Sequence, residues 1–200
     1  MPLVTVFGRT EGAVLTALAR GSASVNGRQI ERLLGGTVSI RGVPGALERL
    51  TRAGLVLAAS RQAETLYRVN REHLLWLTVE ATMNSLTTLR QRIRDLAHES
   101  APNGTAVVLY ESVERVEATA DSDIDLLVVY PDQIPASLRE DFVDELGRRV
   151  ELWTGNPAQV IHITVGGLVE SAGRGDALVD LWLNDSEVLI GELPTLDQHQ

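Results

Sequence analysis

Two aspartates separated by one apolar residue are the clearest candidates for chemistry in this chain. They are Asp123 and Asp125, on either side of Ile124, and an apolar run follows them to residue 130. Side chains alternate between the faces of a β-strand, so the two carboxylates should share one face about 6.6 Å apart along the strand. Carboxylates so placed can hold a pair of divalent cations, such as Mg²⁺, over a triphosphate. The alternative is that they only terminate the loop before a strand.

Ser112 and Arg115 lie in the segment before these aspartates, after an apolar strand predicted from about residue 105. This series of serine, arginine and Asp-x-Asp resembles the signature of the DNA polymerase β-type nucleotidyltransferases, in particular the minimal bacterial ones. The resemblance implies that Asp123 and Asp125 are catalytic residues and metal ligands, with Mg²⁺ as the cofactor. It also implies that Ser112 and Arg115 bind the nucleotide.

The same segment departs from the family pattern at three positions. The family has a glycine before the serine, a small residue before the arginine and a glycine after it, whereas this chain has Glu111, Glu114 and Val116. Glycine allows backbone conformations that a β-branched residue does not. Each carboxylate would also repel a triphosphate by roughly 1 to 4 kcal/mol at contact distance. We therefore expect a nucleotidyltransferase fold with a degenerate site.

A third acidic residue, which the family carries on the strand after the next helix, is missing from the matching segment. That strand is predicted over 159 to 165, QVIHITV, and offers His162 and Thr164 but no carboxylate. Glu151 is an alternative, although its place at the end of a predicted helix favours a solvated side chain. A third acid usually acts as the base or positions one metal, so its absence favours loss of catalysis.

The first 70 residues predict three helices followed by a hairpin. Their expected bounds are 11 to 20, 26 to 34 and 40 to 53 for the helices, with Ser39 as a possible cap of the third, and 55 to 59 and 65 to 69 for the strands. This order, with the phrase LERLTRAGLV, resembles a winged helix-turn-helix domain. The resemblance implies duplex DNA as a partner. The alternative is a winged helix that serves only dimerisation.

Arginines of this region are the candidate DNA contacts, because arginine suits both phosphate and guanine. They are Arg41, Arg49, Arg52, Arg61 and Arg68. Pro44 and Gly45 leave little to read bases in the first turns of the third helix, and Glu48 repels phosphate. Arg61 would lie at the tip of the wing and Arg68 in one of its strands.

Charge is divided unevenly along the 200 residues. All 18 basic residues are arginine; residues 1 to 99 hold 13 of them against 8 acidic residues, and residues 100 to 200 hold 5 against 19. We expect a polyanion to meet the first half, although two ordinary solvated surfaces would give the same counts. There is no cysteine, apolar run of membrane length or signal peptide, which favours a cytoplasmic protein with no membrane contact.

A single long helix is predicted from Arg71 to about Glu99, before the break at Pro102-Asn103-Gly104. Its stripe of Leu86, Leu89, Ile93 and Leu96 predicts a homodimer interface. The expected organisation is a winged helix domain over 1 to 70, a linking helix over 71 to 100 and a nucleotidyltransferase-like domain over 101 to 200.

Together these features predict an α/β (α+β) protein, with a mixed sheet and flanking helices in its second half. Further predicted elements are a helix over 136 to 150, a helix near 176 to 183 and a strand over 188 to 191. The favoured function is DNA-binding transcription regulation, with the second domain used for sensing or partner binding. The alternative is an active Mg²⁺-dependent enzyme that moves a nucleoside monophosphate to a protein, RNA or small-molecule hydroxyl. The resemblance allows a toxin–antitoxin role, with a protein partner, for either function.

Overall fold

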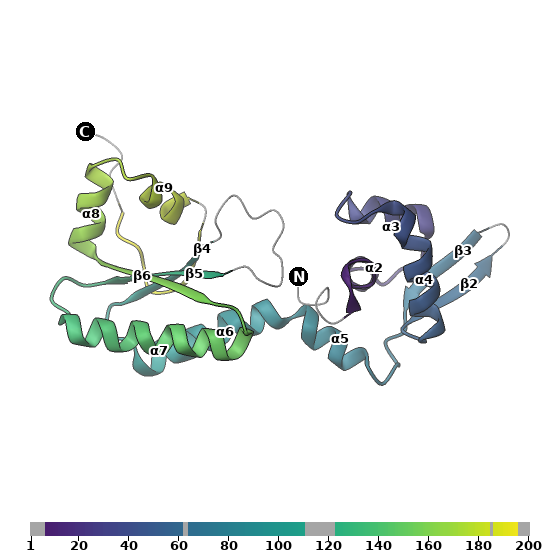
Figure 1. Cartoon of the computed structure of the whole chain (residues 1–200), viewed down its shortest axis with the longest axis horizontal. Coiled ribbons are helices and arrows are strands. Elements are labelled where there is room, and N and C mark those ends of the chain that lie inside the picture. The colour runs from purple at the N-terminus through teal and green to yellow at the C-terminus, as the bar shows by residue number, and fades with distance from the viewer. Residues whose placement is uncertain (1–6, 62–63, 111–122, 185, 196–200) are drawn as a thin grey trace. The chain divides into compact units, whose positions relative to one another are not determined.

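The chain forms two compact units, each a mixture of helices and strands. In the computed structural model, unit 1 is Met1–Ser85 and unit 2 is Leu86–Gln200 (Figure 1). The structure describes residues 7–61, 64–110, 123–184 and 186–195. None of the helices in these ranges is long and apolar enough to cross a membrane.

Unit 1 is built from helices around a small antiparallel sheet. Its elements are α2 (Arg9–Ala19), β1 (Val25–Asn26), α3 (Gly27–Leu34), a 3₁₀ turn (Ile40–Gly42), α4 (Val43–Arg52), β2 (Val56–Arg61), β3 (Glu64–Val69) and α5 (Trp76–Met83). The order of the strands in the sheet is β1-β3-β2. Its core joins Leu15, Ile30 and Leu50 of the three helices to Val56 and Val69 of the hairpin.

Local sequence explains where α3 and α4 begin. The Asn26 side chain accepts from the Gln29 backbone, and the Gln29 side chain accepts from the Asn26 backbone, which forms a capping box. The prediction that Ser39 caps the next helix is wrong, because the Ser39 side chain makes no cap hydrogen bond and α4 begins at Val43. Pro44 has no N–H to donate, so it is tolerated only within the first turn.

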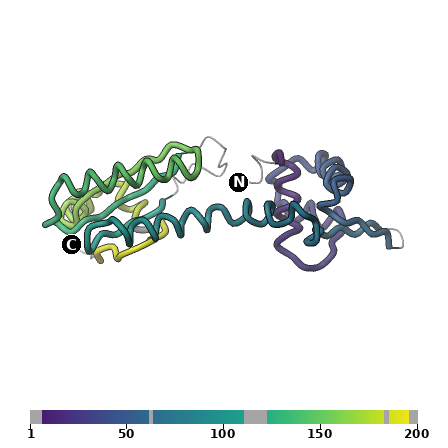
Figure 2. The backbone as a smooth tube through the Cα atoms, turned by 90° about the horizontal axis from the view of Figure 1, so that it is seen from below, coloured from purple at the N-terminus to yellow at the C-terminus, as the bar shows by residue number. Residues whose placement is uncertain are grey.

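Unit 2 is a four-stranded sheet with helices on both faces. Its elements are α6 (Ser85–Ser100), β4 (Ala106–Tyr110), β5 (Ile124–Tyr130), α7 (Ala136–Thr154), β6 (Ala158–Thr164), α8 (Val165–Gly173), α9 (Ala177–Asn184) and β7 (Ser186–Ile190). The strand order is β6-β5-β4-β7, in which only β5 and β6 are parallel, joined through α7. Helices α6 and α7 lie side by side on one face, in teal and green, while α8 and α9 cover the other (Figures 1 and 2).

Alternation along β5 divides the core of unit 2 into two layers. Leu126 and Val128 pack with α6 and α7, whereas Leu127 and Val129 pack with α8 and α9. Every β5 residue after Ile124 is buried. The hydroxyl of Tyr130 donates to the Arg139 carbonyl (3.0 Å), which ties the end of β5 to α7.

The start of α8 is held by residues from two segments. Thr164 Oγ1 accepts from the Gly167 N–H (3.2 Å), and Asp132 Oδ1 accepts from the Gly166 N–H (2.9 Å). The Gly166 backbone and then the Thr164 hydroxyl hold the pKa of Asp132 below its usual value. Asp132 follows β5, so this contact links the end of that strand to the helix that follows β6.

The structure differs from the prediction of one linking helix over 71 to 100. Residues 71 to 75 form turns, and α5 and α6 are separated at Asn84, whose backbone has φ −90° and ψ 5°. Trp76 and Val79 of α5 are buried in the core of unit 1, whereas α6 packs in unit 2. Local propensity favours a single helix, but the two segments pack onto different cores and form two helices.

The predicted dimer stripe is also placed differently. Leu89, Ile93 and Leu96 are buried in the core of unit 2, because α6 lays this face against the sheet. Arg90 and Arg94 fasten the same helix to β7 through Glu187, and Arg94 Nε also donates to the Leu189 carbonyl (3.0 Å). Three of the four stripe residues are thus core contacts of the chain itself, whereas Leu86 is 47% exposed, and dimerisation stays a prediction.

Gly191 is expected to be essential to the pairing of β7 with β4. Its φ is +73°, and a Cβ there would lie 2.6 Å from the Thr105 carbonyl oxygen and 2.8 Å from Ala106 Cα. Backbone strain and overpacking predict that Gly191→Ala lowers the free energy of unfolding by roughly 2 to 4 kcal/mol. Urea unfolding followed by circular dichroism measures the change. Gly173→Ala is the matched control, since a Cβ on that helical glycine meets nothing within 4 Å; equal effects of the two substitutions would contradict this account.

Candidate functional site

Asp123 and Asp125 lie at the beginning of β5, as the sequence predicts. The Ile124 N–H between them donates to the Pro157 carbonyl (2.8 Å), which fixes the backbone against the start of β6. Asp125 is paired with Tyr110 of β4 on one side and with Gln159 of β6 on the other. Its side chain is buried, with 6% of the residue exposed, whereas Asp123 is half-buried.

Gln159 is the residue that completes this group. Paired residues of neighbouring strands share a face, so Gln159 lies beside Asp125 on the side of the sheet that α8 and α9 cover. Its Nε2 donates to Asp123 Oδ2 at 2.8 Å. Gln159 thus lies next to Asp125 in the sheet, while its side-chain amide contacts the Asp123 carboxylate. Sequence analysis did not single out Gln159, because its importance depends on the register of β6.

His162 and Thr164 do not belong to the same group. His162 is on the opposite face of β6, where its ring meets the Tyr130 ring edge-on at 6.2 Å between centroids. Thr164 caps α8. A carboxylate introduced at 162 would therefore lie on the wrong face to join the aspartates. Glu151 Oε1 accepts from the Ala158 N–H (3.4 Å) at the beginning of β6, which gives this acid a structural contact.

Among the described residues, the donors beside Asp123 and Asp125 fall short of a site for two cations. Across residues 7–61, 64–110, 123–184 and 186–195, no three histidine, aspartate or glutamate side chains gather as a metal-binding group. Asp123, Asp125 and Gln159 offer two carboxylates and an amide, and the amide turns its N–H toward Asp123. Ser112 and Arg115, with the departures at Glu111, Glu114 and Val116, lie outside the described residues.

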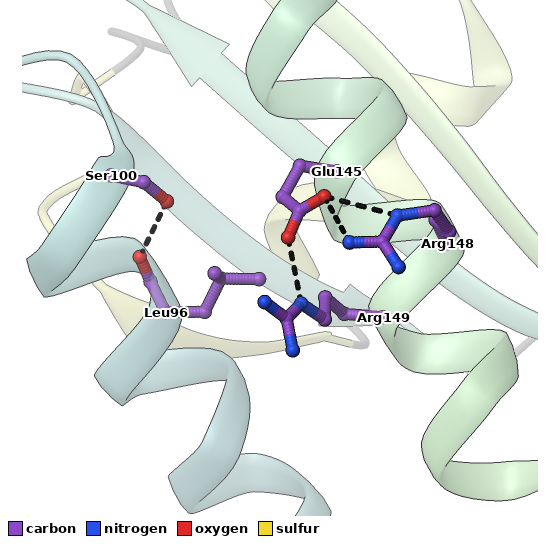
Figure 3. A network of polar contacts seen from close by, with 5 residues as sticks. All are labelled: Leu96, Ser100, Glu145, Arg148 and Arg149. Atoms are coloured by element: carbon purple, nitrogen blue, oxygen red, sulfur yellow. Dashed lines mark hydrogen bonds and ion pairs between the residues drawn. The ribbon is translucent and has the colours of Figure 1, made fainter.

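A groove in unit 2 lies between the end of α6 and the first half of α7. It encloses about 330 Å³ and is lined by apolar side chains such as Leu138 and Phe142, with Asp141 and Glu145 also present. The Glu145 carboxylate accepts from Arg149 Nε (2.7 Å) and from Arg148 (Figure 3). The hydrogen bond from Arg149, and after it that from Arg148, holds the pKa of Glu145 below its usual value. Glu145 therefore stays charged and hydrogen-bonded, which does not suit a general acid.

The predicted DNA-contacting arginines of unit 1 fall into two groups. Arg49 and Arg52 are on the outward face of α4, and both are in ion pairs. Arg49 Nε donates to Glu11 Oε1 of α2 (2.6 Å), and Arg52 Nη2 lies 2.5 Å from Glu48 Oε1 one turn earlier on α4. Their charges are thus partly neutralised within unit 1.

Arg41, Arg61 and Arg68 form the second group, and all three are exposed. Arg41 is in the 3₁₀ turn before α4. The register of the hairpin pairs Arg68 with Leu57 and places Arg61 two pairs further along the same face of β2, so the two arginines share the outer face. Within the part of the chain that the structure describes, no carboxylate lies within ion-pair distance of these three guanidinium groups.

Arg28 and Arg32 are further exposed cations that sequence analysis did not single out. With Glu31 and Ile40 they line a shallow depression beside α3. Their positions opposite Ile30 and Leu34, the buried residues of that helix, are the signal that could have identified them.

Comparison with known proteins gives little beyond this geometry. No family model matches the chain, and no curated protein matches it. Among solved structures, the chain is similar to a tri-AMPylated HEPN toxin in complex with an MNT antitoxin from Shewanella oneidensis, at 16% identity, over 53% of this chain and 72% of that chain. The TM-score of 0.34 is too low for an inference about fold or function.

Converting the amide of Gln159 into a carboxylate should create a cation site. Gln159→Glu places a third carboxylate beside Asp123 and Asp125, and oxygen ligands of this kind favour Mg²⁺ and Mn²⁺. We expect Mn²⁺, titrated by calorimetry at neutral pH, to bind at least about tenfold more tightly to this variant than to the native chain. His162→Glu adds the same charge on the opposite face of β6 and should give no gain. Equal gains in the two variants would show that net charge, and not the face of the sheet, determines binding.

Proposed function

We propose that this chain is a DNA-binding transcription regulator whose second unit is a degenerate nucleotidyltransferase-like domain used for sensing or partner binding. The observation that carries the proposal is the arrangement of unit 1, in which three helices precede a hairpin whose outer face bears Arg61 and Arg68. This order supports the resemblance to a winged helix-turn-helix, and the short strand β1, paired with β3, completes a three-stranded sheet.

Charge supports duplex DNA as the partner of unit 1. This unit carries ten arginines against six glutamates and no aspartate, whereas the remainder of the chain is strongly acidic. Contacts to phosphate dominate affinity in such interfaces and require exposed cations. Arg41, Arg61 and Arg68 meet this requirement, and the exposed pair of Arg52 with Glu48 costs little to exchange for a phosphate, because surface ion pairs contribute about 0 to 1 kcal/mol.

The carboxylates of unit 2 support a role without catalysis. The position beside Asp125 holds an amide, and Gln159 contacts Asp123 directly. A nucleotidyltransferase ancestor with such a change would retain its fold and its surfaces. In our proposal unit 2 then acts through a bound molecule or a protein partner, of the kind found in toxin–antitoxin systems.

An active Mg²⁺-dependent nucleotidyltransferase is the second candidate. Burial of Asp125 favours it, because removing a carboxylate from water is costly and functional sites are where this cost is accepted. Asp125 would then be a metal ligand together with Asp123.

Binding to duplex DNA should depend steeply on salt. Each phosphate contact contributes about −0.9 to the slope of log affinity against log salt concentration. Replacing Arg41 and Arg61 together by alanine should therefore weaken binding and flatten this slope by up to about 1.8. Fluorescence anisotropy of a labelled duplex over a salt series measures both quantities. Arg148→Ala with Arg174→Ala removes two exposed cations from unit 2 and should change neither; binding that is independent of salt would refute the proposal.

Nucleotidyl transfer separates the two candidates. We expect no transfer of label from an α-labelled triphosphate to protein or RNA in the presence of Mg²⁺, for the native chain or for Asp125→Ala, because β6 places the amide of Gln159, and not a carboxylate, beside Asp125. Gel electrophoresis of the reaction detects any labelled product. Transfer by the native chain that disappears in Asp125→Ala would establish the enzyme instead.

A further inference from the structure

The outer faces of α4 and of the β2–β3 hairpin differ in the donors they leave available. On α4, the residues that face away from the core are Pro44, Gly45, Glu48, Arg49 and Arg52. Proline and glycine present no hydrogen-bonding side chain, and glutamate repels phosphate. The only donors on this face are the two arginines.

Both arginines of α4 are already engaged. Arg49 bends back over its own helix, since a Cβ on Gly45 would lie 3.3 Å from Arg49 Nη1, and its Nε donates to Glu11 at 2.6 Å. Glu11 is well covered, with 19% of its side chain exposed. Arg52 is paired with Glu48 of the same face. This exposed pair costs little to exchange for a phosphate, but Glu48 stays beside the guanidinium and repels the incoming phosphate. Reading a base edge requires free donors in a fixed orientation, so α4 is poorly equipped for it.

The hairpin presents the opposite situation. After Val56, every residue of β2 is exposed, and Arg61 and Arg68 stand on the same outer face. The one acid on this face, Glu64, is opposite Arg61 in the register but accepts from Asn26 Nδ2 at 3.2 Å. Leu57, beside Arg68, is 37% exposed. The face thus combines two cations that form no ion pair with a described carboxylate, one acid hydrogen-bonded to Asn26, and a small apolar surface. Its two cations outnumber its one acid, which suits a sugar-phosphate backbone.

From this contrast we infer that the β2–β3 hairpin, and not α4, is the principal DNA-contacting surface, and that it binds duplex DNA through phosphates with little discrimination between sequences. The inference rests on the proposed function, because it specifies how unit 1 meets its partner. Phosphate contacts position a protein on the duplex but carry no sequence information by themselves.

Matched double substitutions in the full-length chain test this inference. Glutamine removes the charge of an arginine while keeping a hydrogen-bond donor, so Arg61→Gln with Arg68→Gln is compared with Arg49→Gln with Arg52→Gln. Anisotropy with a 30-base-pair duplex of arbitrary sequence should show at least about a tenfold loss for the hairpin variant and a salt slope reduced by up to about 1.8. The α4 variant should lose less than about threefold. Lysine at 61 and 68 should restore both affinity and slope, and circular dichroism melting confirms that each variant is folded.

The outcomes separate the inference from the proposal on which it rests. A larger loss in the α4 variant, or equal losses, would overturn the inference while DNA binding by unit 1 stands. Discrimination of more than about a hundredfold among unrelated duplexes would also overturn it, because phosphate contacts alone do not select sequences. Absence of any binding by the native chain at low salt would overturn the proposed function and the inference together.

Discussion

Burial of β5 on both faces is the constraint on which unit 2 depends. A strand between two neighbours, with helices above and below, must be apolar on both sides, and β5 is buried from Asp125 to Tyr130. Its parallel pairing with β6 requires the crossover through α7, which covers one face. The other face needs α8 and α9. The positions of the helices thus follow from one central strand, and so does the unusual burial of a carboxylate at its beginning.

In unit 1, ion pairs determine which arginines of the outward faces are engaged. The core fixes which faces of α4 and of the hairpin point outward, but the chemistry of those faces depends on where the glutamates lie. Glu11, from a different helix, and Glu48, from the same one, together engage both arginines of α4. Among the described residues no carboxylate forms an ion pair with the hairpin arginines, and Glu64, the acid of their face, accepts from Asn26. An unevenly paired surface of this kind cannot be recognised by counting charges along the chain.

Elements that carry a local signal could be predicted from the sequence. Asn26 and Gly35 delimit α3, and Gly35 adopts the left-handed conformation that ends many helices. The strand with Asp123 and Asp125 at its beginning, the following helix and β6 are also where the pattern of apolar residues places them.

Helix α8 was not predicted, because Gly166 and Gly167 in its first turn have low helix propensity and its start depends on Asp132, 34 residues earlier. The separation of α5 from α6 was missed for a similar reason: no proline or glycine marks Asn84, and only packing on two cores interrupts the helix. The pair of aspartates could be found from spacing, whereas its third member and the exclusion of His162 required the register between β5 and β6.

The register between β5 and β6 also means that a substitution at residue 159 alone would add a carboxylate beside Asp125. The codons for glutamine and glutamate differ in their first base alone, so the residue beside Asp125 is separated from a carboxylate by a single point mutation. Such a change would leave the backbone of β6 and the buried layers of the sheet in place, because Gln159 is exposed on an edge strand. One base change could therefore add an acid at this position without rebuilding the domain.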